Sequence, residues 1–244
     1  MIDRGEAHVS DNARQYENYI SHQLRPLDDR ARRNRIDYFI HNYRRHLPVD
    51  KDAPILDYGC GRGECIQFLQ GQGYRNIDAV DISAEVVEHA SRLLPNRVRQ
   101  VTDPAAFVGE KAGSYDLVTF LEVVEHIPSA EVVDFLSGLK RLLRPGGKAI
   151  IETPNGEAPF ANAHMYHDAT HIRLYTLESL RHVLALAGYK NVAIYGLDIP
   201  LTRSGRYVQR LTQRTIHAAV TLLRAMEGAL PPTLLTPMFY AVAS

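Results

Sequence analysis

The stretch ILDYGCGRGE, from Ile55 to Glu64, constrains the fold of this chain more than any other feature of the sequence. An apolar run with the length of a buried strand leads into it, and residues 64–70 have a helical pattern. Glycines at positions 59, 61 and 63 permit a tight turn and let a ligand approach the backbone amides. We therefore expect a strand, a ligand-binding loop and a helix, in that order, around a nucleotide-type cofactor.

Short apolar runs alternate with helical patterns from Pro54 onward, which is typical of a parallel sheet covered by helices. We expect strands at APILDYG, NIDAVDI, RVRQVTD, SYDLVTF, GGKAIIETP, KNVAIYGL and TPMFYAVA. The main helices are expected at 64–70, 83–94, 130–143 and 176–187. The sequence thus predicts an α/β fold.

Two helical regions, 12–46 and about 205–230, lie outside this alternation. Neither has a clear core of its own, so we expect both to be attached to one α/β domain. We divide the chain into an N-terminal helical cap at 1–50 and a main domain at 51–244, with a helical insertion at about 203–230.

Charge and composition exclude several classes of protein. Lysine and arginine total 28, as do aspartate and glutamate, so no overall field favours a nucleic acid partner. The first residues contain no apolar signal-peptide core, and no apolar run approaches the ~18 residues of a membrane span. We therefore expect a cytoplasmic protein, with Cys60 and Cys65 as small buried residues near the turn.

Two acidic residues accompany the glycine loop. Asp81 ends the next strand, about twenty residues on, where its carboxylate is able to accept both hydrogen bonds of a ribose diol. Asp57 ends the first strand, where it would repel a pyrophosphate but suit an ammonium or sulfonium group. The loop has the spacing G-x-G-x-G, which differs from the dinucleotide pattern G-x-G-x-x-G.

At this point the sequence resembles the class I S-adenosylmethionine-dependent methyltransferases, from about Pro54 to Gly196. The resemblance rests on ILDYGCGRGE, AVDIS, DLVTFLEVVEH and LKRLLRPGGKAIIETPN. It implies a Rossmann-like sheet of seven strands with helices on both faces, and TPMFYAVA as the last, antiparallel strand. It also implies S-adenosylmethionine as the cofactor.

The resemblance further implies which residues bind the cofactor. The loop and Asp57 would contact the methionine part and Asp81 the ribose, while Thr102 and Asp103 map to the adenine contact. An alternative for Asp103 is the N-cap of the short helix at PAAF. The full predicted set is Asp57, Tyr58, Gly59, Cys60, Gly61, Asp81, Ile82, Thr102, Asp103, Leu121 and Glu122.

Acceptor chemistry is expected where the fourth and fifth strands end, at FLEVVEHIP and in the later stretch HMYHDATHIRLYTLESL. Transfer of a methyl group to a hydroxyl requires alignment and removal of a proton. Histidine titrates near neutrality and is able to accept that proton. The candidate bases are His126, His167 and His171.

A metal site is the alternative for the same region. The run EVVEH with a later histidine resembles small-RNA 2′-O-methyltransferases and some ubiquinone-pathway O-methyltransferases, in which such residues hold a divalent cation. The ligands here would be Glu122, Glu125, His126 and His171. We favour a metal-free site, in which Glu122 lines the cofactor pocket, Glu125 caps or pairs, and His126 packs beneath the substrate loop.

The helical regions suggest further contacts. In the family, N-terminal helices fold over the cofactor, so Tyr16 and Tyr19 are expected to help close the pocket. Arginines recur at helical spacing in the late helix, at Arg203, Arg206, Arg210 and Arg214, opposite a face with Val208, Leu211 and Leu222. This stripe would hold a phosphate-bearing acceptor, rest peripherally on an anionic membrane, or be an exposed charged face whose other side is packed.

We therefore predict an S-adenosylmethionine-dependent O-methyltransferase acting on a hydroxyl of a sugar, glycan or other small molecule. The stretch HDATHIRLYT resembles methyltransferases of bacterial surface-polysaccharide and secondary-metabolite sugar pathways. The alternatives are a metal-dependent methyltransferase of a quinol or RNA 2′-hydroxyl, and, in another class, a non-catalytic nucleotide-binding module. We predict no nucleic acid partner and no particular oligomeric state.

Overall fold

The computed structural model describes residues 16, 28–202, 204–229, 232 and 234–244. Its seven-stranded sheet has the order β3-β2-β1-β4-β5-β7-β6. Strands β1 to β5 pair in parallel, and β7 runs antiparallel between β5 and β6. The strands are β1 Ile55–Tyr58, β2 Ile77–Asp81, β3 Val98–Gln100, β4 Tyr115–Leu121, β5 Leu143–Pro154, β6 Val192–Gly196 and β7 Met238–Ala243. The predicted Rossmann-like sheet with an antiparallel last strand is confirmed.

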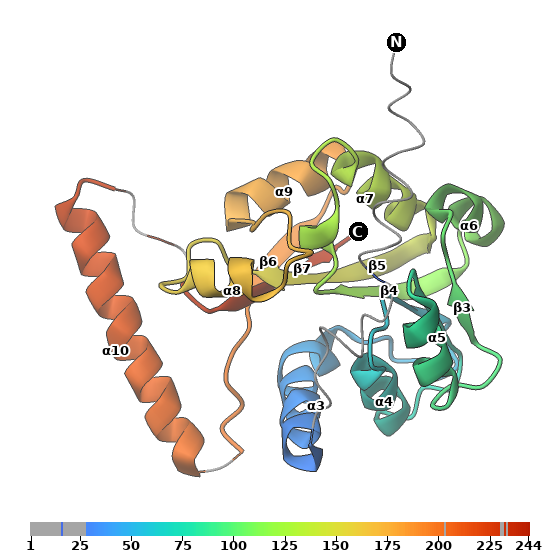
Figure 1. Ribbon diagram of the computed structural model, residues 1–244, viewed down its shortest axis with the longest axis horizontal. Helices are drawn as coiled ribbons and strands as arrows, with labels where there is room; N and C mark the ends of the chain where they lie inside the picture. The colour runs from blue at the N-terminus through green and yellow to red at the C-terminus, as the bar shows by residue number, and fades with distance from the viewer. Residues whose placement is uncertain (1–15, 17–27, 203, 230–231, 233) are drawn as a thin grey trace.

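Helices cover both faces of the sheet (Figure 1). One face carries α3 Asp29–Tyr43, α4 Glu64–Gly71 and α5 Ala84–Ser91, and the other carries α6 Pro104–Lys111, α7 Val132–Arg141 and α9 Leu177–Leu186. Successive side chains of a strand point to opposite faces, so Ile55 packs with the first group and Leu56 with the second. The central strands are therefore apolar on both sides, as the continuous apolar runs predicted.

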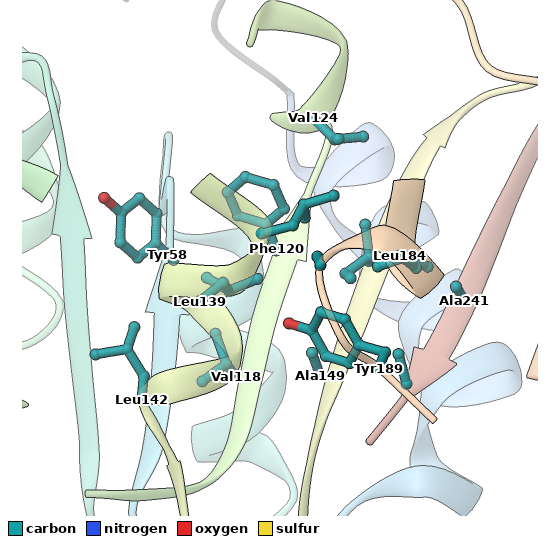
Figure 2. Packing of buried hydrophobic residues seen from close by; sticks show 14 of the residues in the cluster. Tyr58, Val118, Phe120, Val124, Leu139, Leu142, Ala149, Leu184, Tyr189 and Ala241 are labelled. Atoms are coloured by element: carbon teal, nitrogen blue, oxygen red, sulfur yellow. The ribbon is translucent and has the colours of Figure 1, made fainter. Parts of the chain in front are cut away.

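The core beneath α7 and α9 is well filled (Figure 2). Tyr58, Phe120 and Phe135 form an aromatic cluster with ring centroids 5.5 to 5.7 Å apart. Edge and stacked contacts at this spacing add to the free energy gained from area burial. This cluster lies directly under the carboxyl ends of β1 and β4, so it fixes the positions of both strand ends.

Several predicted boundaries shift by a few residues. Thr176 is the N-cap of α9, as predicted, and forms a capping box with Ser179. Ser83 caps α5, which ends earlier than predicted, at Ser91. The N-terminal region continues beyond α3 as a 3-10 turn, η1 Arg44–His46, whereas 12–15 and 17–27 lie outside the described residues. Cys60 and Cys65 are free and buried, as predicted.

Helix α3 is part of the same core as the sheet. Phe39 and Tyr43 are buried and pack with Phe68 of α4 and Tyr240 of β7. Asp28 caps the helix by accepting a hydrogen bond from the Ala31 amide. The packing sets one side of α3 against the carboxyl end of the sheet.

The late helix, α10 Ser204–Met226, stands apart from the sheet (Figure 1). Its arginines do not form the predicted stripe, because Arg206 is buried and donates to Asn34 Oδ1 at 2.8 Å. One of the predicted arrangements is an exposed charged face whose other, apolar side is packed. The structure instead exposes the apolar residues Val208, Leu211 and Leu222. Polar partners on α3 have turned the polar side of α10 inward, while Arg203 lies outside the described residues.

Candidate active site

A cavity of about 1180 Å³ opens at the carboxyl ends of β1, β2 and β4. The glycine loop and the ends of these strands form its floor, and side chains of α3 and α10 form its sides. It exceeds the ~300–1,000 Å³ of most small-molecule pockets, so it has room for a nucleoside cofactor and a second small molecule.

Backbone geometry builds the cofactor end of this cavity. Gly59 and Gly63 have φ of 78° and 79°, in the left-handed region that favours glycine. A Cβ on Gly59 would lie 2.4 Å from Val123 Cγ2, so the loop passes directly against the segment after β4. The amides of Gly59 and Cys60 both donate to the Val80 carbonyl, at 2.8 and 3.1 Å. The turn is thereby tied to β2.

Asp81 lies at the end of β2, as predicted, and faces the glycine loop. Its carboxylate accepts hydrogen bonds from the Gly61 amide at 3.1 Å and the Ser83 amide at 3.0 Å. Burial raises the pKa of Asp81, and these backbone donors oppose the shift. A carboxylate oxygen is able to accept more than one hydrogen bond. Both oxygens of Asp81 therefore remain able to accept a hydrogen bond from a ribose hydroxyl.

Asp57 is buried at the end of β1. Thr119 Oγ1 donates to its Oδ1 at 2.8 Å, while its Oδ2 has no partner within the part of the chain that the structure describes. Burial raises the pKa of Asp57 to about 7, against the opposing effect of the Thr119 hydrogen bond. A cation placed in the cavity would satisfy this carboxylate, which fits the predicted contact with an ammonium or sulfonium group.

Glu122 follows β4 and pairs with Arg35 of α3. Its backbone has φ of 56°, unusual for a non-glycine residue, and turns the side chain toward α3. Removal from water would raise the pKa of Glu122, but the Arg35 guanidinium outweighs this effect and lowers it. Arg35 also lies 3.5 Å from the buried carboxylate of Glu152 in β5. No local pattern in the sequence singles out Arg35 among the arginines of α3.

Two imidazoles face each other on the acceptor side of the cavity. His126 belongs to a 3-10 turn, η2 Val124–His126, and its ring centroid lies 4.8 Å from that of His171. His126 Nδ1 contacts the Thr170 carbonyl at 3.1 Å, and His171 Nδ1 contacts the His164 carbonyl at 2.9 Å. A carbonyl oxygen only accepts, so each Nδ1 carries the hydrogen, and a ring that holds no second hydrogen keeps a lone pair on Nε2.

A chain of hydrogen bonds holds the His126 ring in place. Thr170 Oγ1 lies 2.9 Å from His126 Nδ1 and donates its own hydrogen to Asp168 Oδ1 at 2.6 Å. Burial lowers the pKa of His126, and the nearby His171 lowers it further. At neutral pH His126 is therefore uncharged and able to accept a proton.

Glu125 is fully buried beside these imidazoles. Thr153 donates to its Oε2 at 3.1 Å, whereas Oε1 has no partner among the described residues. Burial raises the pKa of Glu125 to about 8. Glu125, His126 and His171 each offer one atom that is able to bind a metal ion. These three atoms lie within 4.8 Å of one another. Glu122, the remaining member of the predicted metal set, is not part of this group, because it pairs with Arg35.

The other predicted residues divide between the cavity and its surroundings. Tyr16 lines the cavity with its ring 6.3 Å from His126, as expected for an N-terminal aromatic residue, while Tyr19 lies outside the described residues. His167 also lines it but is exposed. Asp103 does not line it, and instead caps α6 by accepting from the Ala106 amide at 3.0 Å. The predicted cofactor residues that do line the cavity are Asp57, Tyr58, Gly59, Cys60, Gly61, Asp81, Ile82, Thr102, Leu121 and Glu122.

The sheet order with its antiparallel β7, the glycine turn after β1 and the acid at the end of β2 together define a class of protein, the S-adenosylmethionine-dependent methyltransferases. Comparison with known proteins agrees with this class. Residues 30–194, more than half of the chain, match a family profile described as a methyltransferase domain. The chain belongs to this methyltransferase family.

Curated relatives with similar sequences are ubiquinone biosynthesis O-methyltransferases. That of Xanthomonas oryzae pv. oryzae is 36% identical over 110 residues, which cover 42% of this chain and 44% of the relative. That of Rickettsia bellii is 30% identical over 138 residues, which cover 56% and 53%. The chain spans about half the length of the curated relatives it matches.

Solved structures share the fold at low sequence identity. A S-adenosylmethionine-dependent methyltransferase from Archaeoglobus fulgidus has a TM-score of 0.61 at 20% identity, over 85% of this chain and 93% of that one. A methyltransferase from Thermotoga maritima, described as a possible histamine N-methyltransferase, has a TM-score of 0.59 at 15% identity, over 98% and 96%. These likenesses concern the fold.

Proposed function

We propose that this protein transfers the methyl group of S-adenosylmethionine to a hydroxyl of a small-molecule acceptor. The observation that carries the proposal is the pair of oriented imidazoles across the cavity from the glycine loop. In both His126 and His171 a backbone carbonyl holds the hydrogen on Nδ1, which leaves Nε2 as an acceptor. An acceptor hydroxyl lying between the cofactor and these rings would find a base ready for its proton.

The chemistry follows from this arrangement. The acceptor oxygen attacks the methyl carbon, the bond from that carbon to sulfur breaks, and S-adenosylhomocysteine leaves as a neutral thioether. The hydroxyl proton passes to an imidazole Nε2. Asp81 would hold the ribose and Asp57 the cationic methionine part, so the cofactor half of the cavity acts by alignment.

We propose a phenolic hydroxyl as the first acceptor class. The curated relatives are named for ubiquinone biosynthesis, and the cavity wall includes the apolar or aromatic side chains Tyr16, Tyr38, Ile127, Phe135, Ile199 and Met238. A flat aromatic ring suits such a lining better than a polyhydroxylated sugar. Sugars and glycans are the second acceptor class.

The test is methyl transfer from labelled S-adenosylmethionine to a panel of catechols, nucleotide sugars, glycans and short RNAs. We expect label in a methyl ether of a catechol, with nucleotide sugars as weaker acceptors. Label that enters RNA, or no transfer to any hydroxyl compound, would contradict the proposal. The variant His89→Ala, altered on α5 away from the cavity, serves as a matched control for histidine substitutions.

A divalent cation at Glu125, His126 and His171 is the second candidate. It is favoured by one observation, the buried Glu125 Oε1 without a partner among the described residues and close to both imidazoles. Two nitrogen donors and a carboxylate are a common set for a catalytic divalent cation. A bound cation would act as a Lewis acid on the acceptor hydroxyl.

Chelation distinguishes the two candidates. If the imidazoles act alone, EDTA leaves kcat unchanged and elemental analysis finds no bound metal. If a cation takes part, EDTA lowers kcat by roughly tenfold or more, and an added divalent metal restores kcat. We expect the first result, because Nε2 of each imidazole is positioned to accept a proton directly.

A further inference from the structure

Helix α10 presents an apolar side to its surroundings. Along this helix, residues at positions 207, 208, 211, 222 and 226 fall on one face at the 100° helical repeat. They are large and between 60% and 76% exposed: Tyr207, Val208, Leu211, Leu222 and Met226. Large exposed apolar residues gathered on one face of a helix are typical of a surface that binds another component.

The polar side of the same helix faces the protein. Arg206 donates to Asn34 Oδ1 at 2.8 Å and to the Pro200 carbonyl at 3.1 Å. Near the other end, Arg224 pairs with Glu157 at 3.0 Å. Between these two anchors, Gln209 and Gln213 line the cavity. The anchors fix the rotation of the helix, so its apolar face is held outward.

Charge decides which partner fits this face. Within α10 the sequence has four arginines and no acidic residue. Arg210 and Arg214 make no ion pair within the described residues, and Arg214 lies beside Tyr207 and Leu211 at the border of the apolar face. A second copy packed on this face would bring arginines toward arginines with no acid to pair them. An anionic surface would instead complement them.

We propose that α10 lies on an anionic lipid bilayer, with its apolar face in the headgroup region and Arg210 and Arg214 against the phosphates. No helix in the described part of the chain has the length and apolar content to cross a membrane, so the contact would be interfacial. Phe160 and Tyr166, next to and within α8 Ala161–His167, are also strongly exposed and follow the Glu157 anchor.

The test is co-sedimentation of the full chain with phosphatidylglycerol-containing vesicles and with phosphatidylcholine vesicles. We expect binding to the anionic vesicles, weakened by about 0.5 M NaCl because salt screens the arginines. The variant Leu211→Glu with Leu222→Glu should lower the partition coefficient roughly tenfold or more. Arg210→Ala with Arg214→Ala should lower it roughly fivefold for each arginine removed.

A matched control carries the same two added charges elsewhere. Val49→Glu with Leu186→Glu alters two exposed apolar residues outside α10, so it should bind vesicles like the wild type. Equal binding by the Leu211 and Leu222 variant, or none by the wild type, would overturn the proposal. So would a wild-type dimer in sedimentation equilibrium that this variant dissociates, since the occupant would then be a second copy. The assay needs neither cofactor nor acceptor, so its failure leaves the proposed methyl transfer untouched.

Discussion

The two halves of the cavity are built in different ways. The cofactor half is built largely from one stretch of chain, in which β1 and β2 carry Asp57 and Asp81 and backbone hydrogen bonds tie the glycine turn to β2. Thr119 of β4 adds a side-chain hydrogen bond to Asp57. The acceptor half comes from segments far apart in the sequence, with Arg35 from α3, His126 after β4 and His171 after α8. The first half therefore depends on local geometry and the second on packing between elements.

The two halves should therefore respond differently to substitution. Substitutions in the cofactor half should alter affinity for S-adenosylmethionine, because its side chains act in binding. Substitutions in the acceptor half should alter turnover with little effect on cofactor affinity, because its imidazoles are proposed to act on the acceptor proton. Four predictions test this separation.

The largest effect is expected for the imidazoles. His126→Ala removes the better-oriented base and should lower kcat by about 10² to 10⁴. The dissociation constant for S-adenosylmethionine, measured by calorimetry, should change less than about threefold. The control His89→Ala should match the wild type in both measurements. A fall in cofactor affinity as large as the fall in kcat would mean that His126 only supports the structure.

The next effect concerns Asp81. Asp81→Asn removes a charged acceptor from the predicted ribose contact and should raise the dissociation constant for S-adenosylmethionine roughly ten- to a hundredfold. Asp116→Asn, which alters a surface ion pair with Arg144, serves as the control and should leave binding unchanged. If Asp81→Asn binds the cofactor as well as the wild type, the ribose contact is elsewhere.

Asp57 should make cofactor binding depend on pH. Its pKa of about 7 in the free protein means that it is partly protonated at neutral pH. A cationic cofactor favours the ionised form, so affinity should rise about tenfold between about pH 6 and pH 8 and then level off. Asp57→Asn should abolish this dependence, and calorimetry in buffers of different ionisation enthalpy should detect the released proton. An affinity independent of pH in the wild type would contradict the assignment.

The same carboxyl has the opposite effect on the stability of the free protein. Its pKa is raised from 3.8, so the folded state holds the proton more tightly than the unfolded state. The stabilisation that Asp57 contributes is fully present below its pKa in the unfolded state. It is lost as pH rises through its pKa in the folded state. Cofactor binding and intrinsic stability therefore change in opposite directions over this pH range.

The smallest effect is expected at Asp103. Because it caps α6, Asp103→Ala should lower the free energy of unfolding by about 1 kcal/mol. The dissociation constant for the cofactor should stay within about twofold of the wild type, since the side chain does not line the cavity. Urea denaturation and calorimetry measure the two quantities. A tenfold loss of cofactor affinity with normal stability would instead support the predicted contact between Asp103 and the adenine.

The residues that line the cofactor end of the cavity carry local signals in the sequence. Glycines at fixed spacing, an apolar strand before them and an acid at the end of the next strand require no knowledge of distant contacts. The topology of the sheet, with β7 antiparallel, came from family resemblance, since periodicity does not order strands. Asp103 shows the limit of that resemblance, because an aspartate before proline at a helix start is also a good N-cap.

Less of the acceptor half carries a local signal in the sequence. The histidines were identified, but the Thr170 and Asp168 hydrogen bonds that orient His126 depend on how a later loop packs over η2. Arg35 was one of several arginines, and only the approach of α3 to β4 selects it as the partner of Glu122. The apolar face of α10 points outward, against the usual expectation for an amphipathic helix, and polar contacts at both ends hold the opposite side against the protein.

Titration calorimetry with S-adenosylmethionine and, separately, with NAD is the decisive experiment on the cofactor site. If the glycine turn, Asp57 and Asp81 form a methyltransferase cofactor site, the wild-type protein binds one S-adenosylmethionine per chain and does not bind NAD. Binding of NAD without binding of S-adenosylmethionine would contradict the account.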